Sequence, residues 1–214
     1  MIVSHQHQFV FMKTLKTAGT SVEIELSRVC GPDDVITPLP DEDEELRRER
    51  GGRPGQNHES PPLRARVHEH IRASKVRPII GREVWDGYYK FAIERNPWDA
   101  VVSLFYWLRR YDMVDTFERY LTMPNIEQLA TRNYRAYHVN GRVAVDRVLR
   151  FERLADDLAE VWGHLSLPGE PDLPYAKSGA RPSGSDYREL YDADSVELVR
   201  RVFARQIEEL GYEF

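Results

Sequence analysis

The sequence contains a single cysteine, Cys30, among its 214 residues. No disulfide can form within this sequence, so an oxidising compartment is not implied. Burial of one small residue needs no special chemistry, whereas a reactive thiol needs an electropositive, accessible setting. We therefore expect Cys30 to be a buried structural residue.

Long apolar runs are also missing. The sequence has no stretch of about 18 consecutive apolar residues, which a transmembrane helix requires. The segment Met1 to His7 lacks the positive charge and apolar core of a secretory signal peptide. The sequence therefore predicts a soluble, cytoplasmic protein with no membrane span.

A basic charge balance is missing too, since 30 Lys and Arg residues stand against 35 Asp and Glu residues, a net charge of −5. General nucleic-acid binding is not expected, because it depends on a basic face that releases counterions.

Metal ligands cluster only at His68, Glu69 and His70 with no companion group, so no metal site is expected. The length favours one compact domain over residues 1–214.

The segment from about residue 38 to residue 66 is distinct in composition. It is dense in charged residues, proline and glycine, and such a sequence buries little apolar area. The segment therefore predicts a flexible charged loop at about 38–66, which is either solvated or a lid that binds a substrate.

A short apolar run, Phe9 to Met12, leads into a small, hydroxyl-rich turn. The residues of the turn are Lys16, Thr17, Ala18, Gly19, Thr20 and Ser21. A strand that turns in this way into a helix presents backbone N–H groups and the positive helix end to an anion. The ATP pattern G-x-x-x-x-G-K-[ST] places its lysine after the last glycine, whereas Lys16 precedes Gly19. The turn predicts a phosphate site and weakens an ATP interpretation.

A second strand-to-helix turn follows the segment 85–94, which is rich in aromatic and β-branched residues and predicts a strand. Asn96 suits the N-cap of the next helix, and Pro97 suits its first position. Ser103 lies seven residues after Asn96, about two helical turns on, so both residues share a helix face. Arg95 and Ser103 can therefore converge on one anion.

Helical patterns alternate with these predicted strands. They cover residues 70–80, 98–109, 114–121, 126–137, 154–164 and 195–210. This alternation predicts an α/β fold with a mainly parallel central sheet flanked by helices, and ligands of such folds bind beyond the carboxyl ends of the strands. Both predicted phosphate sites begin at such ends.

The two turns resemble motifs of sulfotransferases that use 3′-phosphoadenosine 5′-phosphosulfate (PAPS). Lys16 to Ser21 resembles the family's 5′-phosphosulfate loop, and Arg95-Asn96-Pro97 with Ser103 eight positions after Arg95 resembles its 3′-phosphate motif. Val148 to Leu154 resembles the strand and helix start that follow, so the resemblance spans nearly the whole chain. The form Lys-Thr-Ala-Gly-Thr-Ser is closest to the carbohydrate-type branch.

This resemblance implies a P-loop-kinase-like fold and an enzyme that moves a sulfuryl group from PAPS to a hydroxyl, with a carbohydrate as the expected acceptor. Adenosine 3′,5′-bisphosphate (PAP) would be the product, and no metal would be needed. Animal relatives of the carbohydrate type are usually anchored by an N-terminal span, which this sequence lacks. The architecture is therefore typical of a microbial or viral source.

The resemblance also implies roles for single residues. Lys16 would approach the bridging oxygen of the donor, and Arg95 and Ser103 would hold the 3′-phosphate. Lys177 and Arg181 lie in a late loop that would close over the cofactor. The residues that would bind the 5′-phosphate with Lys16 are Thr17, Ala18, Gly19, Thr20 and Ser21.

The acceptor hydroxyl must lose its proton, and a histidine or a carboxylate is the natural base near neutral pH. His70 resembles a histidine that precedes the central strand in carbohydrate-type relatives, with His68 and Glu69 as close competitors.

Other functions stay open. The chain could be an ATP-dependent P-loop kinase, or a non-catalytic relative that binds PAPS or a glycan without turnover. For the acceptor, arginines suit acidic sugars and aromatic faces suit sugar rings. Four residues could therefore line an acceptor cleft or equally belong to a helix end packed on the core: Trp107, Arg109, Arg110 and Tyr111.

Overall fold

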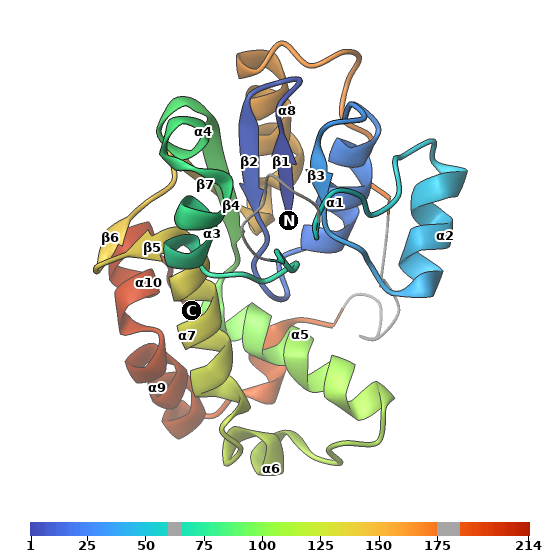
Figure 1. Cartoon of the computed structure of the whole chain (residues 1–214). Helices are drawn as coiled ribbons and strands as arrows, with labels where there is room; N and C mark the ends of the chain where they lie inside the picture. The colour runs from blue at the N-terminus through green and yellow to red at the C-terminus, as the bar shows by residue number, and fades with distance from the viewer. Residues whose placement is uncertain (60–65, 175–184) are drawn as a thin grey trace. The chain divides into compact units, whose positions relative to one another are not determined.

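The computed structural model describes residues 1–59, 66–174 and 185–214. Two compact units emerge from the pattern of internal contacts. The first comprises Met1–Glu94 and Arg135–Ala176, and the second comprises Arg95–Tyr134 and Lys177–Phe214. The chain thus passes from the first unit to the second, returns to the first and ends in the second (Figure 1). The single domain over residues 1–214 stays a prediction.

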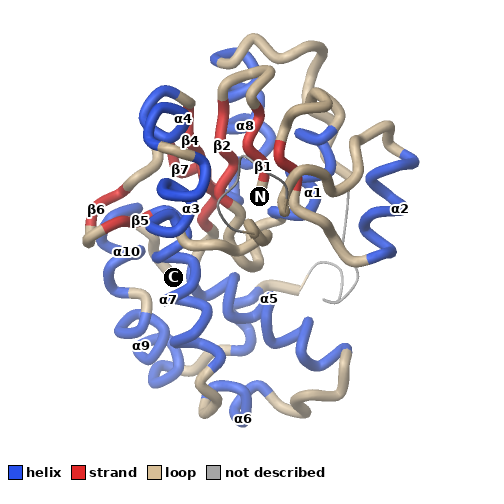
Figure 2. The backbone as a smooth tube through the Cα atoms, in the orientation of Figure 1, coloured by secondary structure: helices blue, strands red, loops and turns tan. Residues whose placement is uncertain are grey.

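The first unit is built on a five-stranded sheet in the order β3-β1-β2-β4-β7, drawn in red in Figure 2. β2 pairs in parallel with β4, and β4 pairs in parallel with β7. β1 is antiparallel to both of its neighbours. The remaining four strands, β3, β2, β4 and β7, therefore all run in the same direction. The prediction of a mainly parallel sheet is confirmed, with β1 as an unpredicted exception. The strands are β1 (Ile2–Ser4), β2 (Phe9–Met12), β3 (Val35–Ile36), β4 (Tyr89–Glu94) and β7 (Arg147–Arg150).

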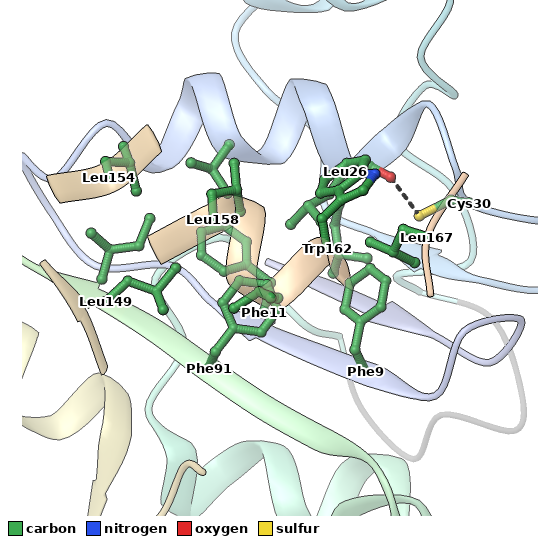
Figure 3. Close-up of a cluster of buried hydrophobic side chains, with 14 of the residues drawn as sticks. Phe9, Phe11, Leu26, Cys30, Phe91, Leu149, Leu154, Leu158, Trp162 and Leu167 are labelled. Atoms are coloured by element: carbon green, nitrogen blue, oxygen red, sulfur yellow. Dashed lines mark hydrogen bonds between the residues drawn. The ribbon is translucent and has the colours of Figure 1, made fainter. Parts of the chain in front are cut away.

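One face of the sheet is covered by α1 (Gly19–Ser27) and α8 (Leu154–His164). Their apolar side chains meet those of the strands in a buried core (Figure 3). Removal of apolar area from water stabilises the fold by about 25 cal/mol per Å², so this core holds α1 and α8 against the sheet. The labelled members are Phe9, Phe11, Leu26, Cys30, Phe91, Leu149, Leu154, Leu158, Trp162 and Leu167.

Cys30 lies at the edge of this core. Its side chain is 5% exposed, and its Sγ donates to the carbonyl oxygen of Leu26 at 3.3 Å (Figure 3). Burial raises the pKa of the thiol, which keeps it protonated. The prediction of a buried, structural cysteine is confirmed.

The opposite face of the sheet is covered by α3 (Ala73–Ile80) and α4 (Arg82–Gly87). α3 falls within the helix predicted over 70–80. The prediction of a strand from residue 85 onward was wrong for its first residues, because α4 continues to Gly87 and β4 begins at Tyr89. Trp85 is 5% exposed and packs in the core under this face, so its aromatic ring reflects burial of a helix side rather than strand propensity.

The charged segment is not a loop throughout. α2 occupies Asp41–Glu49, with four acidic residues in its first turn and arginines in its last turn, which complements the helix dipole. Arg47 is fully buried and pairs with Glu44 at 2.7 Å, and its NH2 lies 3.6 Å from Glu23 of α1. The prediction of a loop was wrong for residues 41–49, which form a helix. One of the charged residues, Arg47, is buried in the fold and paired with carboxylates rather than solvated. Residues 60–65 lie outside the described residues.

Two short strands complete the first unit. β5 (His138–Val139) and β6 (Arg142–Val143) form an antiparallel pair apart from the main sheet. A 3₁₀ turn over Phe151–Arg153 leads from β7 into α8, at the position predicted for a strand-to-helix transition.

The second unit is helical in its described part. The predicted helices near residues 98–109, 114–121, 126–137 and 195–210 are confirmed, but the last one is two helices. It breaks at Phe203, which is 1% exposed and whose φ of −101° and ψ of 19° are not helical. The elements are α5 (Pro97–Arg110), α6 (Phe117–Leu121), the start of α7 (Asn125–Tyr137), a 3₁₀ turn over Tyr187–Leu190, α9 (Ala193–Val202) and α10 (Ala204–Leu210). Across the described ranges, every helix is too short or too polar to cross a membrane.

Arg47→Ala should lower the free energy of unfolding by about 3 kcal/mol, because it leaves the largely buried carboxylate of Glu44 without its cationic partner and removes one of the cationic groups around Glu23. The matched control is Arg48→Ala, the next residue of α2, whose side chain is exposed and should change stability by less than about 0.5 kcal/mol. Urea denaturation of both variants measures the difference. Equal losses would show that α2 is not anchored through Arg47.

Candidate functional site

The turn between β2 and α1 has an unusual backbone. Lys16 and Ala18 both have positive φ, 63° and 59°, although neither is glycine. Such conformations cost of order 1–3 kcal/mol and persist only where the surrounding structure fixes them, often at functional sites. Left-handed residues in a turn direct successive N–H groups into a concavity that binds anions. α1 begins at Gly19, so its positive end lies at the same turn.

Gly19 has a steric reason to be glycine. A Cβ atom at this position would lie 2.8 Å from Cγ of Lys13 and 3.3 Å from the carbonyl oxygen of Thr14. The turn is therefore folded tightly back on the end of β2. Any larger residue would push the first turn of α1 away from it.

Hydrogen bonds tie the turn to the neighbouring strand. Thr14 Oγ1 donates to the carbonyl oxygen of Ile93 at 2.5 Å, near the carboxyl end of β4. Thr14 Oγ1 also lies 2.8 Å from Thr17 Oγ1, and Thr17 is fully buried. The hydroxyl of Thr17 thus serves the turn itself. Thr20 and Ser21 are 8% and 4% exposed in the first turn of α1.

A buried lysine that the sequence analysis did not assign lies beneath the turn. Lys13 is 3% exposed, and its Nζ pairs with Glu23 Oε2 at 2.8 Å and Glu69 Oε2 at 2.6 Å. Burial alone would lower the pKa of Lys13, but the two carboxylates outweigh it and raise the pKa. Lys13 is therefore a fixed cation. Its signal in the sequence is a lysine directly after a buried strand, which is costly unless the charge is paired.

Glu23 is the carboxylate at the centre of these contacts. It is fully buried and accepts ion pairs from Lys13 and from the amino group of Met1, both at 2.8 Å. Burial would raise the pKa of Glu23, but Lys13, the Met1 amine and Arg47 outweigh burial and lower it to about 2. Glu23 is therefore ionised at neutral pH.

The structure brings His70 to the same turn. Its Nδ1 lies 3.2 Å from the carbonyl oxygen of Lys13, and its Nε2 lies 3.8 Å from Glu69 Oε2. Burial and the ammonium of Lys13 lower the pKa of His70 to about 4. The imidazole is therefore neutral at neutral pH, and the carbonyl contact assigns its proton to Nδ1 and leaves Nε2 as the proton acceptor.

The two competitors of His70 have other surroundings. Glu69 is held by Lys13, and although burial would raise the pKa of Glu69, that cation lowers it. Its carboxylate is therefore engaged by the ammonium of Lys13. The side chain of His68 is exposed.

In the second unit, the structure confirms the predicted start of α5. Asn96 is the N-cap, since its side chain accepts from the backbone N–H of Trp98 at 3.1 Å, and Pro97 is the first helical residue. Asn96 Nδ2 also donates to the carbonyl oxygen of Glu213 at 2.8 Å, which ties the cap to the C-terminal segment. The cap therefore fixes the backbone next to Arg95.

Arg95 forms an ion pair within this unit. Its Nε and NH2 both donate to Asp99 Oδ2, at 2.7 and 2.6 Å, and both side chains are largely buried. This pair uses two of the five N–H groups of a guanidinium and fixes its orientation. Ser103 is partly exposed in α5. Lys177 and Arg181, the other predicted cofactor residues, lie outside the described residues.

The end of α5 carries exposed aromatic residues. Trp107 and Tyr111 are 36% and 57% exposed, with ring centroids 5.2 Å apart at an interplanar angle of 62°. Arg109 and Arg110 are exposed beside them. Both alternatives for this helix end, an acceptor cleft and packing on the core, stay predictions. In the part of the chain that the structure describes, no group of three or more His, Cys, Asp or Glu residues could hold a metal ion.

Comparison with known proteins adds a relative and a partly similar structure. No family model matches the chain. An uncharacterized protein from Archaeoglobus fulgidus is 33% identical over 101 residues, which cover 46% of this chain and 84% of that protein. The crystal structure of a sulfotransferase from Alicyclobacillus acidocaldarius is similar over 97% of this chain and 96% of its own, with a TM-score of 0.44 and 18% identity. A likeness this distant does not determine function.

Two neighbouring substitutions in the turn should differ in their effect. Gly19→Ala should lower the free energy of unfolding by about 1–3 kcal/mol, because its Cβ overlaps Lys13 and Thr14. Ala18→Gly relieves a left-handed backbone that costs about 1–2 kcal/mol, offset by the greater freedom of glycine in the unfolded chain, so it should be neutral or stabilising. Thermal and urea denaturation measure both. A stable Gly19→Ala variant would contradict the tight turn.

Proposed function

We propose that this chain, which belongs to the same family as the uncharacterized protein of Archaeoglobus fulgidus, is a sulfotransferase. The proposed reaction moves a sulfuryl group from PAPS to a hydroxyl acceptor, a carbohydrate, and releases PAP. The observation that carries the proposal is the turn from Lys16 to Ser21, whose left-handed residues and helix start suit a phosphate.

The chemistry suits the residues at this turn. Sulfuryl transfer is an in-line exchange in which the enzyme positions the partners and neutralises charge that develops on the leaving group. The leaving group is the 5′-phosphate oxygen of PAP. We assign Lys16 to that oxygen, since a compact ammonium suits a single oxygen better than a planar guanidinium does. The backbone N–H groups from Thr17 to Ser21 would hold the remaining phosphate oxygens.

His70 is assigned as the general base. In the proposed step, His70 Nε2 takes the proton of the acceptor hydroxyl while the acceptor oxygen bonds to sulfur. The bond between sulfur and the 5′-phosphate oxygen breaks, and PAP leaves with that electron pair. The neutral state of His70 and its contact with the carbonyl of Lys13 support this role, because a base must hold its lone pair before the reaction.

We assign the 3′-phosphate of the donor to Arg95 and Ser103. The ion pair with Asp99 supports this role, since it holds the guanidinium in one orientation before a ligand arrives. Lys177 and Arg181 are proposed to cover the donor. PAP carries a 3′-phosphate that adenosine 5′-phosphate lacks, whereas both nucleotides carry the 5′-phosphate. The role of Arg95 can therefore be tested separately from that of Lys16.

Two alternatives are separable by experiment. An ATP-dependent kinase would bind ATP more tightly when magnesium is added, and the order of Lys16 and Gly19 disfavours it. A non-catalytic relative would bind PAP but transfer no labelled sulfate from PAPS to any member of a carbohydrate panel. For an enzyme, transfer should be present in the natural chain and lost in Lys16→Ala.

Arg95→Ala should raise the Kd for PAP by about 10- to 100-fold, the loss expected for hydrogen bonds to a charged group, and should leave the Kd for adenosine 5′-phosphate unchanged. The matched control is Arg119→Ala, which removes another i,i+4 arginine–aspartate pair of the second unit, with Asp115. Isothermal titration calorimetry measures all three proteins. Equal losses for both nucleotides would refute the assignment of Arg95 to the 3′-phosphate.

The exposed pair of Trp107 and Tyr111 supports a carbohydrate acceptor, because aromatic faces stack on sugar rings and the adjacent arginines suit acidic sugars. Trp107→Ala should raise the KM for the acceptor about 10-fold, a loss within the range of an aromatic contact, and leave the Kd for PAP unchanged. Met113→Ala is the control, since Met113 is a 56% exposed apolar residue nearby in sequence without a ring. An unchanged acceptor KM in Trp107→Ala would place the acceptor elsewhere.

A further inference from the structure

Glu69 lies next to two groups with different roles in a proton transfer, the permanent cation Lys13 and the proposed base His70. Its Oε2 lies 2.6 Å from Lys13 Nζ and 3.8 Å from His70 Nε2. The same carboxylate oxygen is therefore within ion-pair distance of a fixed cation and of the nitrogen that would become cationic. Lys13 does not depend on Glu69 for a counter-charge, since Glu23 is a fully buried partner at 2.8 Å.

Building on the function proposed above, we propose that Glu69 is a positioning residue for His70. While His70 is neutral, the Glu69 carboxylate pairs with Lys13. When His70 Nε2 takes the proton of the acceptor hydroxyl, the same carboxylate stabilises the imidazolium, and Lys13 keeps Glu23 as its counter-charge.

Burial supports this division of roles between the two carboxylates. The side chains of Lys13 and Glu23 are 2% and 0% exposed, whereas that of Glu69 is 34% exposed. Glu23 is enclosed in the fold, so its contact with Lys13 is permanent. Glu69 lies at the solvent edge of the cluster, where a side chain can adjust at low cost. Glu69 is therefore the partner that can shift toward His70.

The orientation of the imidazole supports the same role. His70 Nδ1 lies 3.2 Å from the carbonyl oxygen of Lys13, which fixes the ring and directs the opposite nitrogen, Nε2, toward Glu69. A carbonyl on one ring nitrogen and a carboxylate near the other is an arrangement that stabilises the doubly protonated ring. His70 is thus prepared on both sides for the proton that it would receive.

The charges around His70 make Glu69 decisive. Burial disfavours the imidazolium, and so do the ammonium of Lys13, at the end of β2, and the amino group of Met1, at the start of β1. Glu23 of α1 contacts both the Lys13 ammonium and the Met1 amine at 2.8 Å, and burial lowers the pKa of that amine to about 5. Of the charged groups that act on His70, Glu69 is the one that favours protonation most. Its removal would leave the nascent imidazolium next to the ammonium of Lys13 without the carboxylate that favours protonation.

The test compares Glu69→Gln, which keeps the shape and removes the charge, with Asp146→Asn. In the control, Lys90 of the first unit loses the carboxylate of Asp146, whose Oδ2 lies 2.8 Å from Lys90 Nζ. That ion pair includes no histidine. Titration of the His70 imidazole by NMR should show a pKa near 4 in the natural chain and in Asp146→Asn. In Glu69→Gln the pKa should fall by about 1 unit or more, because a neighbouring opposite charge is lost.

The kinetic readout is the pH profile of sulfate transfer from PAPS. Glu69→Gln should lower kcat about 3- to 10-fold, since a weaker base transfers protons less efficiently, and should move the acid limb of kcat/KM to lower pH. The KM for PAPS should stay unchanged. Glu69→Asp keeps the charge and should restore part of kcat, which a purely structural role would not predict.

The outcomes separate this inference from the function on which it rests. If no acceptor is sulfated by any variant, the proposed function fails, and the NMR titration still reports whether Glu69 acts on His70. If the natural chain transfers sulfate, a His70 pKa that is unchanged or raised in Glu69→Gln overturns the positioning role. The same conclusion follows if Glu69→Gln retains the full kcat and pH profile.

Discussion

The ion pairs of the buried lysine Lys13 hold together the three chain segments of the candidate site. The ammonium joins the end of β2 to α1 through Glu23 and to the segment before α3 through Glu69. The backbone of Lys13 contributes as well, since its carbonyl oxygen orients His70. The Lys13 side chain packs so closely on position 19 that only glycine fits there. Removing one partner from such a cluster leaves a buried charge, which costs several kcal/mol. The turn between β2 and α1 is therefore fixed before any ligand binds.

The two lysines of this region consequently have different chemistry. Lys13 is enclosed and neutralised by two carboxylates, so it acts on its neighbours through its field and its backbone. Lys16 is partly exposed on a left-handed backbone, at the position where an anion would meet the start of α1. A rigid cation behind the turn and an accessible one within it suit a reaction in which charge moves onto a leaving phosphate. His70, kept neutral next to Lys13, is the proton acceptor of the proposed reaction.

Local signals in the sequence predicted the parts of this structure that depend on neighbouring residues. The strand-to-helix turn at Gly19 and the cap at Asn96 follow from residue types at fixed spacings, and both are present. The buried charges of Lys13 and Arg47 were not predicted, because their partners lie far away in the sequence and a charged residue ordinarily indicates solvent. The break at Phe203 was missed for a similar reason, since the apolar repeat continues through it. The ligand roles of the two motifs stay predictions.

The central proposal is that the turn from Lys16 to Ser21 binds the 5′-phosphate of the nucleotide. A crystal structure of the protein with PAP bound tests this claim most directly. The account predicts a PAP molecule whose 5′-phosphate lies on the N–H groups of residues 17–21. A PAP molecule whose 5′-phosphate lies away from this turn would contradict it.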